Sequence, residues 1–93
     1  MFAVIFKARI AEVDDEYSRM AERMKKLAFE KYGCLDFVSA TEGKEEIAIS
    51  YWDTERQIRD WKNDPEHRLA QIRGREKWYE SFDIEICEII RKR

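Results

Sequence analysis

Residues 34–52 read CLDFVSATEGKEEIAISYW, two largely apolar runs separated by a charged turn. The runs at 34–41 and 46–52 contain the β-branched and aromatic residues that favour strands. The four residues between them, 42–45, include Gly43, which can adopt the positive φ that a short hairpin turn needs. This stretch predicts a β-hairpin in the middle of the chain.

A strand and a helix are expected before this hairpin. In FAVIFKARI (2–10) apolar residues recur at every second position, which is typical of a strand. Asp14 or Asp15 can then cap a helix whose apolar residues recur at i, i+3 and i+4 spacing. Gly33 is suited to end that helix, because glycine readily adopts the left-handed conformation found after many helices.

A helix in two pieces and a last strand are expected after the hairpin. Residues 54–57, TERQ, have the form of a capping box, which predicts the start of a short helix. Asp64-Pro65 then starts a second helix, because Asp favours the N-cap and Pro the first helical position. We expect this helix to run to about Ser81 and residues 83–90, DIEICEII, to form the last strand.

The order β-α-β-β-α-β predicts an α+β fold of the ferredoxin-like type, with a four-stranded antiparallel sheet and a second helix broken at Pro65. We expect residues 1–93 to form one domain. The first strand carries apolar side chains on both of its faces, with Ala3 and Ile5 opposite Val4 and Phe6. Because helices would cover only one face, a second copy of the sheet is the simplest cover for the other, so we expect a homodimer.

The composition excludes several classes of protein. Of the 93 residues 44% are hydrophobic and 41% charged, and the net charge of −2 argues against a nucleic-acid partner. No apolar run is long enough to span a membrane, and no signal-peptide pattern follows Met1, which favours a cytoplasmic protein. Two cysteines and one histidine are too few for a zinc site or a disulfide framework, so no metal is expected.

Chemistry is most plausible along one stripe of the second helical region. At 100° per residue this stripe contains His67, Ala70, Gln71, Gly74, Trp78 and Phe82. The start of a helix disfavours an added proton, so His67 should be neutral and able to accept a proton from a substrate hydroxyl. Structural alternatives stay open: His67 as a hydrogen-bonded residue at the helix start, Gly74 as a site of close packing, and the aromatic residues as core.

The chain resembles the antibiotic biosynthesis monooxygenase family over essentially its whole length. The resemblance is carried by Gly33-Cys34, Tyr51-Trp52-Asp53-Thr54, WKNDPEH at 61–67, Ala70-Gln71 and GREKWYE at 74–80. It implies a dimeric α/β barrel in which two ferredoxin-like sheets meet face to face. It also implies a cofactor-independent monooxygenase or oxidase that acts with O₂ on an aromatic phenol or quinol.

The resemblance further implies a set of site residues. His67 would be the catalytic base in a pocket that Trp61 and Trp78 line. Less specific polar contacts with the substrate are implied for Tyr51, Asn63, Gln71 and Arg75. No cofactor is expected, because the chain has no flavin or dinucleotide signature.

Two other functions remain open. The haem-degrading relatives use an Asn on the first strand and an axial His one helical turn after the position of His67. Here residues 2–10 contain no Asn, and the later position is Gln71, which is not a haem ligand. The stronger alternative is a non-catalytic module that binds a small molecule on the same dimeric barrel, because a fold does not determine a function.

Overall fold

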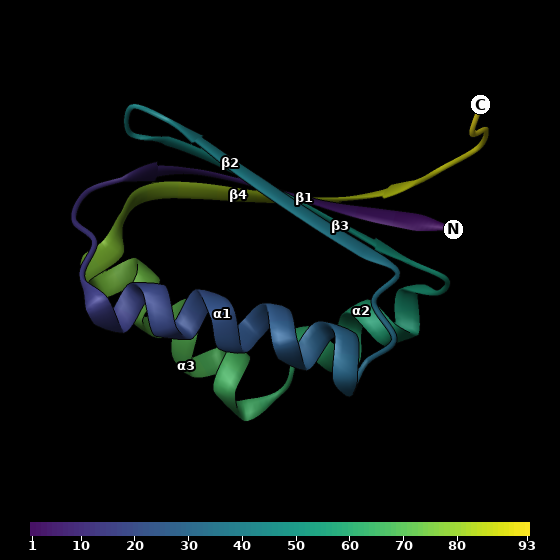
Figure 1. Ribbon diagram of the computed structural model, residues 1–93, viewed down its shortest axis with the longest axis horizontal. Helices are drawn as coiled ribbons and strands as arrows, with labels where there is room; N and C mark the ends of the chain where they lie inside the picture. The colour runs from purple at the N-terminus through teal and green to yellow at the C-terminus, as the bar shows by residue number, and fades with distance from the viewer.

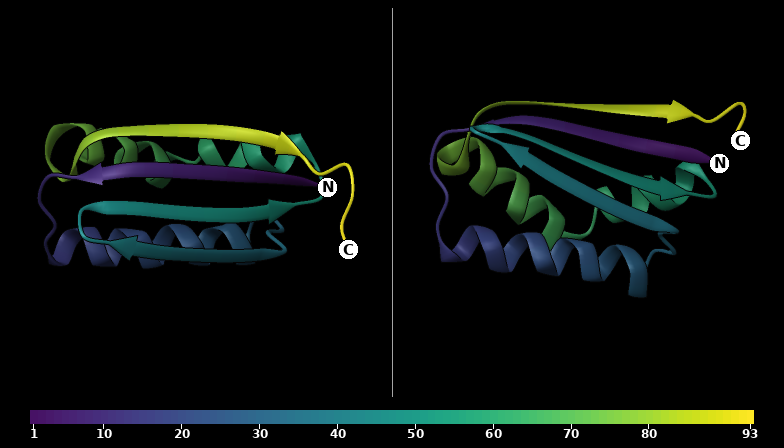
Figure 2. Two further views of the ribbon diagram at one scale, coloured as in Figure 1. Left: turned by 90° about the horizontal axis from the view of Figure 1, so that it is seen from above. Right: turned by 45° about the horizontal axis from the view of Figure 1, so that its top comes forward.

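Four strands form one antiparallel sheet, and the helices all lie on one of its faces (Figures 1 and 2). The computed structural model describes residues 1–93. The strand order is β2-β3-β1-β4, so the first strand is central and the hairpin lies at one side. The strands are β1 (Phe2–Ile10), β2 (Asp36–Glu42), β3 (Glu45–Trp52) and β4 (Tyr79–Glu88). The predicted ferredoxin-like α+β fold is therefore confirmed.

The helices begin where their capping residues predicted. Asp14 accepts a hydrogen bond from the backbone of Tyr17, Thr54 and Gln57 form a complete capping box, and Asp64 accepts from the backbone of Glu66. None of the helices is long and apolar enough to cross a bilayer. The helices are α1 (Asp15–Glu30), α2 (Glu55–Lys62) and α3 (Pro65–Arg73), followed by one π-helical turn, η1 (Gly74–Trp78).

The predicted end of the last helix is wrong by three residues. The helix does not reach Ser81 but ends at Trp78, and β4 begins at once, at Tyr79 rather than at residue 83. The reason lies in the partner strand. Residues 79–82 pair with the end of β1, with Phe82 opposite Ala8. They therefore extend β4 instead of the helix.

The core lies between the inner face of the sheet, which faces the helices, and α1 and α2. Its eight buried residues include Trp52 and Ile58, which are 0% and 1% exposed. The indole N–H groups in this core are paired: Trp52 donates to Ser50 Oγ at 2.9 Å and Trp61 to the carbonyl of Met24 at 3.1 Å. The remaining core residues are Val4, Met24, Leu27, Ala28 and Cys34.

No helix covers the outer face of the sheet (Figure 2), and this face carries apolar side chains together with charged ones such as Lys7 and Glu85. Strand register places Ile5 beside Ile49, and Ile49 beside Val38, on this face. Val38 is 50% exposed and the neighbouring Ile47 43% exposed. A shallow hollow on this face is lined by Met1, Ala3, Ile5, Leu35, Asp36, Ile49, Tyr51, Ile89 and Lys92.

Two glycines with positive φ allow a prediction about stability. Gly33 has a φ of 76°, and a Cβ there would lie 2.6 Å from Gln57 Nε2. Gly43 has a φ of 59° with open space around it. Gly43→Ala should therefore cost about 1 kcal/mol for the left-handed backbone alone. Gly33→Ala should cost about 2–3 kcal/mol, because it also disturbs the capping box. Urea unfolding of both variants tests this, and equal losses would contradict it.

Candidate functional site

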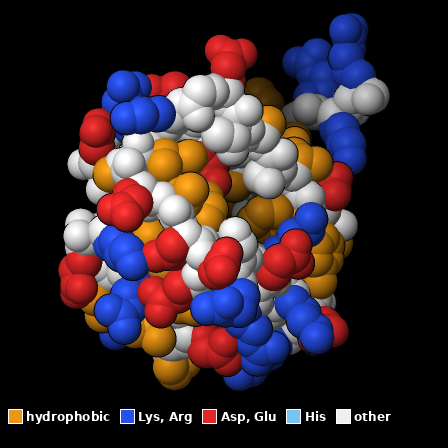
Figure 3. All heavy atoms as spheres, turned by 60° about the vertical axis from the view of Figure 1, so that its left-hand side comes forward, with side chains coloured by type: hydrophobic (Ala, Val, Ile, Leu, Met, Phe, Trp, Pro, Cys, Tyr) orange, Lys and Arg blue, Asp and Glu red, His pale blue; other side chains and the backbone are white.

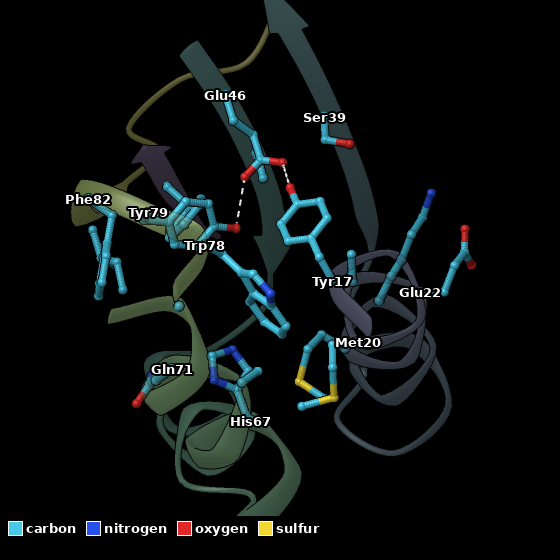
Figure 4. Close-up of a pocket in the computed structure, with 18 of the residues that line it drawn as sticks. Tyr17, Met20, Glu22, Ser39, Glu46, His67, Gln71, Trp78, Tyr79 and Phe82 are labelled. Atoms are coloured by element: carbon cyan, nitrogen blue, oxygen red, sulfur yellow. Dashed lines mark hydrogen bonds between the residues drawn. The ribbon is translucent and has the colours of Figure 1, made fainter. Parts of the chain in front are cut away.

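A cavity of about 440 Å³ lies between the inner face of the sheet and the helices α1 and α3 (Figure 4). This volume is in the range of small-molecule sites. Hydrophobic residues make up 14 of the 23 that line it. Seen from the end where α1 begins, apolar side chains are bordered by charged ones of both signs (Figure 3). The apolar walls include Val4, Phe6, Met20, Met24, Phe37, Ala48, Trp61, Phe82 and Ile84.

His67 reaches the cavity from the first turn of α3. Asp64 at the N-cap and Pro65 at the first position direct this turn towards α2, where the imidazole meets the Trp61 indole edge to face at 4.4 Å between ring centroids. His67 Nδ1 is buried and has no hydrogen-bond partner. A buried polar atom without a partner is unusual and marks a place where a ligand can supply one.

Burial lowers the pKa of His67 to about 4, and the positive charge of Lys62 adds to the effect. The backbone carbonyl of His67 itself and the Asp64 carboxylate act in the opposite direction but do not offset the burial. The imidazole is therefore neutral at physiological pH. In that form one ring nitrogen accepts a hydrogen bond and the other donates one.

Trp78 forms the wall between the helices and β4. It is 2% exposed, and its Nε1 has no partner of hydrogen-bond geometry. The Tyr17 ring meets it edge to face at 5.4 Å between centroids. The Asp14 carboxylate lies near this indole: the pKa of Asp14 is lowered chiefly by Lys77, then by the backbone of Tyr17, with a smaller contribution from Trp78.

Three side chains form what we call the tyrosine–carboxylate cluster: Tyr17 from α1, Glu46 from β3 and Tyr79 from β4 (Figure 4). Tyr17 donates to Glu46 Oε1, and Tyr79 donates to Glu46 Oε2 at 3.0 Å. Burial, with the charge of Glu46, raises the pKa of Tyr17 to about 12 and raises that of Tyr79 as well. Both phenols thus remain protonated donors to a carboxylate inside the cavity.

Tyr79 points into the cavity because of two local features. The pairing of β4 with β1 shifts between Ser81 and Tyr79, so Glu80 is an extra residue, and such a bulge redirects the neighbouring side chain. The Tyr79 ring then packs on Gly74, where a Cβ would lie 3.0 Å from Tyr79 Cδ2. The glycine at the start of the π turn therefore makes room for the tyrosine rather than for a ligand.

The structure brings four of the predicted site residues together: Trp61, His67, Gln71 and Trp78 all line the cavity. The other three do not reach it. Tyr51 lies between Ser50 and Trp52, which face the helices, so the pleat of the strand turns its side chain to the outer face.

Asn63 and Arg75 lie outside the cavity for local reasons. Asn63 caps the end of α2, and its side chain accepts a hydrogen bond from Arg68 Nη2 at 3.0 Å. Arg75 is exposed, and its guanidinium lies 5.6 Å from the centroid of the Phe82 ring, which itself lines the cavity. These two residues and Tyr51 therefore do not line the cavity in which a ligand contact was predicted for them.

Sequence reasoning missed the tyrosine–carboxylate cluster. One signal for it was present: Glu46 shares strand parity with Ala48, Ser50 and Trp52, so a charged residue falls on the face that otherwise packs against the helices. Its tyrosine partners lie 29 and 33 residues away in the chain, and no local pattern connects them. No three His, Cys, Asp or Glu side chains gather in a way that could hold a metal ion.

Comparison with known sequences finds a related protein. No protein-family model matches the chain. The uncharacterised protein YqjZ of Bacillus subtilis (strain 168) is 38% identical over 93 residues, which cover 99% of this chain and 82% of YqjZ.

Solved structures extend the comparison to the fold. SnoaB of Streptomyces nogalater, described as a cofactor-independent oxygenase, superposes with a TM-score of 0.80 at 10% identity over 98% of this chain and 94% of its own. Rv0793 of Mycobacterium tuberculosis gives 0.83 at 11% identity over 98% and 96%. A Deinococcus radiodurans protein assigned by name to the antibiotic biosynthesis monooxygenases gives 0.74 at 11% identity over 99% and 95%.

The fold is that of the antibiotic biosynthesis monooxygenases, which confirms the resemblance found in the sequence. At identities of 10–11% these structures establish the fold alone. Within this fold class, the chain belongs to the same family as YqjZ.

The single histidine of the chain makes its protonation directly measurable, because one imidazole C2 proton resonance needs no assignment. We expect His67 to titrate at a pKa of about 4 rather than at 6.5. Since the folded state then binds this proton less readily than the unfolded chain, stability should fall as the pH drops from 6.5 towards 4. Above that window the protonation of His67 should not affect stability. A midpoint near 6.5 in the folded protein would contradict the burial of the ring.

Proposed function

We propose that this protein is a cofactor-independent oxygenase that acts with O₂ on an aromatic phenol or quinol. The observation that carries the proposal is the buried, unpartnered Nδ1 of a neutral His67 in a cavity walled by aromatic side chains. The fold shared with SnoaB, itself described as a cofactor-independent oxygenase, supports the same reaction class. His67 would be the catalytic base, with Trp61, Trp78 and Gln71 as substrate contacts.

Removal of the phenolic proton is the step that this cavity can assist. An imidazole with a pKa of about 4 is a weak base towards an isolated phenol. In a cavity of low polarity, however, proton transfer creates an imidazolium next to a phenolate, and their attraction offsets much of the desolvation that depressed the pKa of His67. The electron-rich phenolate can then transfer one electron to O₂ without help from a flavin or metal.

The walls of the cavity support this chemistry in two ways. The flat faces of Trp61 and Trp78 suit a fused aromatic ring, and the amide of Gln71, one turn after His67 on α3, can hydrogen-bond a ring substituent. The largely apolar lining excludes water, which would otherwise quench reactive oxygen intermediates.

The proposal includes a homodimer in which the outer faces of two sheets cover each other, in the cytoplasm. The uncovered outer face carries Ile5, Ile47 and Ile49 on neighbouring strands, and a second copy of the sheet would remove these apolar side chains from water. This arrangement also gives Tyr51 a place in the interface instead of in the cavity.

The dimer is tested by light scattering coupled to size exclusion at micromolar concentration, where we expect twice the 11.3 kDa of the chain. Ile49→Lys places a charge in the centre of the outer face and should dissociate the dimer. Ile72→Lys is the matched control, because Ile72 is 49% exposed on α3 and lies on the other side of the molecule. A folded monomer of the unaltered protein would overturn this part of the proposal.

A non-catalytic module that binds a small aromatic molecule is the second candidate function. It is favoured by the low pKa of His67, which suits a hydrogen-bond acceptor better than a base. Aerobic turnover separates the two functions, because a binding module would retain the ligand without consuming O₂.

Replacement of His67 should affect turnover more than folding. His67→Ala should cost about 1 kcal/mol of stability, because the ring is only partly buried. It should lower O₂ consumption with 1,4-naphthoquinol, measured above the uncatalysed rate, by on the order of 10²-fold or more. His67→Gln should show the same loss, since an amide keeps the hydrogen bond but takes no proton.

Trp78→Ala is the contrasting variant and should lose about 3–5 kcal/mol of stability, because it leaves a large cavity at a residue that is 2% exposed. Unchanged turnover in a folded His67→Ala protein would remove the assignment of His67 as the base.

A further inference from the structure

We infer that the carboxylate of Glu46, held by Tyr17 and Tyr79, is the anchor for a hydrogen-bond donor of the ligand. The cavity would thereby select aromatic molecules that carry a hydroxyl or amino group and reject carboxylates and sulfonates. The inference rests on the proposed function in taking this cavity as the ligand site, but it does not depend on catalysis.

The position of Glu46 calls for an explanation beyond packing. On the inner face it lies opposite Ala8 of β1, in line with Ala48 and Ser50 along its own strand. Its neighbour Glu45 points to the outer face and pairs with Arg9 at 2.7 Å. Glu46 has no such cation, and its carboxylate takes part in none of the six ion pairs of the chain.

The tyrosine–carboxylate cluster has free hydrogen-bond acceptor positions but no free donor. A carboxylate has about four acceptor positions, and the two tyrosines fill one on each oxygen of Glu46. The only donors of the cluster, the two phenolic O–H groups, are both used. What the cluster still offers a ligand is therefore acceptor capacity, which suits an incoming O–H or N–H and gives nothing to an anion.

The charges around the cavity support the same selection. Lys25 and Lys62 are the only cationic residues that line it. Lys25 is eight residues beyond Tyr17 on α1, about 12 Å at the rise of a helix, and its ammonium lies 5.9 Å from the centroid of the Phe37 ring. Glu22, which also lines the cavity, lies one turn before Lys25. No cation therefore balances Glu46 at the cluster itself.

The cluster and His67 give the cavity two polar ends. In Figure 4 Glu46 and His67 lie at opposite ends of the labelled group, with Tyr17 and Trp78 between them. A ring system with hydroxyl groups at both ends could donate to Glu46 at one end and to His67 at the other. This extends the proposed substrate class from phenols in general to aromatic diols that span the cavity.

The selection is tested by calorimetric binding of three probes at pH 7 without O₂: 2-naphthol, 2-methoxynaphthalene and 2-naphthoate. The unaltered protein should bind 2-naphthol on the order of 10-fold more tightly than either of the other two, because hydrogen bonds to charged groups are strong and like charges repel. In Glu46→Gln the preference for 2-naphthol over 2-naphthoate should fall to about 3-fold or less, since the charge is gone.

Glu42→Gln is the matched control. Glu42 is exposed at the end of β2, so this substitution removes the same charge at a site away from the cavity. The preference of Glu42→Gln for 2-naphthol over 2-naphthoate should equal that of the unaltered protein. Equal affinities for 2-naphthol and 2-naphthoate in the unaltered protein, no detectable binding of 2-naphthol, or an unchanged preference in Glu46→Gln would each overturn the inference.

A second measurement keeps the inference testable if Glu46→Gln fails to fold. Tyr17→Phe leaves the carboxylate in place and frees one acceptor position, so its preference for 2-naphthol should be kept or increased. In the unaltered protein, 2-naphthol should shift the ¹³Cζ resonances of Tyr17 and Tyr79 but not that of Tyr51, which faces away from the cavity. Shifts confined to Tyr51 would overturn the inference.

Failure of this inference can be distinguished from failure of the proposed function. Loss of selectivity in Glu46→Gln without any turnover of 1,4-naphthoquinol by the unaltered protein would leave the anchor in place and remove the oxygenase. Turnover that depends on His67, together with unchanged selectivity in Glu46→Gln, would support the oxygenase and remove Glu46 as the anchor.

Discussion

The Trp61 indole joins the elements that surround the cavity. Its N–H donates to the carbonyl of Met24 on α1, and its ring packs against Trp52 of β3 at 5.1 Å and against His67 of α3 at 4.4 Å between centroids. The edge of Phe37 on β2 adds a fourth contact at 6.2 Å. Because one rigid, hydrogen-bonded side chain sets these distances together, the imidazole of His67 is positioned by the core of the fold rather than by a flexible loop.

Next to that core, two polar groups line the cavity at positions where apolar side chains would pack equally well. His67 Nδ1 has no partner, and Glu46 has two tyrosines but no cation. A buried nitrogen without a partner is costly, and a carboxylate on the face that packs against the helices replaces an apolar contact, so a fold selected only for stability would lack both. Their gathering in one cavity with aromatic walls is the physical reason to regard it as a ligand site.

Local chemistry made much of the fold predictable. The caps at Asp14, Thr54 and Asp64 depend on hydrogen bonds between residues two or three apart, and a single sequence contains that information. The end of α3 was less predictable. Residues 79–82 have no local preference strong enough to decide between helix and strand, and pairing with β1, some 70 positions earlier, decided it.

The candidate site likewise has one part that depends on local spacing and one part that depends on contacts between distant residues. The helical spacing of His67 and Gln71 placed both on one stripe of α3, so the sequence by itself determined that these two side chains share a wall of the cavity, which Trp78 of the following π turn extends. Which residues face them depended on long-range contacts. The pleat of β3 turned Tyr51 away and Glu46 inward, and a bulge in β4 brought Tyr79 to Glu46. Only the tertiary structure decided these contacts, because strand register and bulges are set by partner strands rather than by local preference.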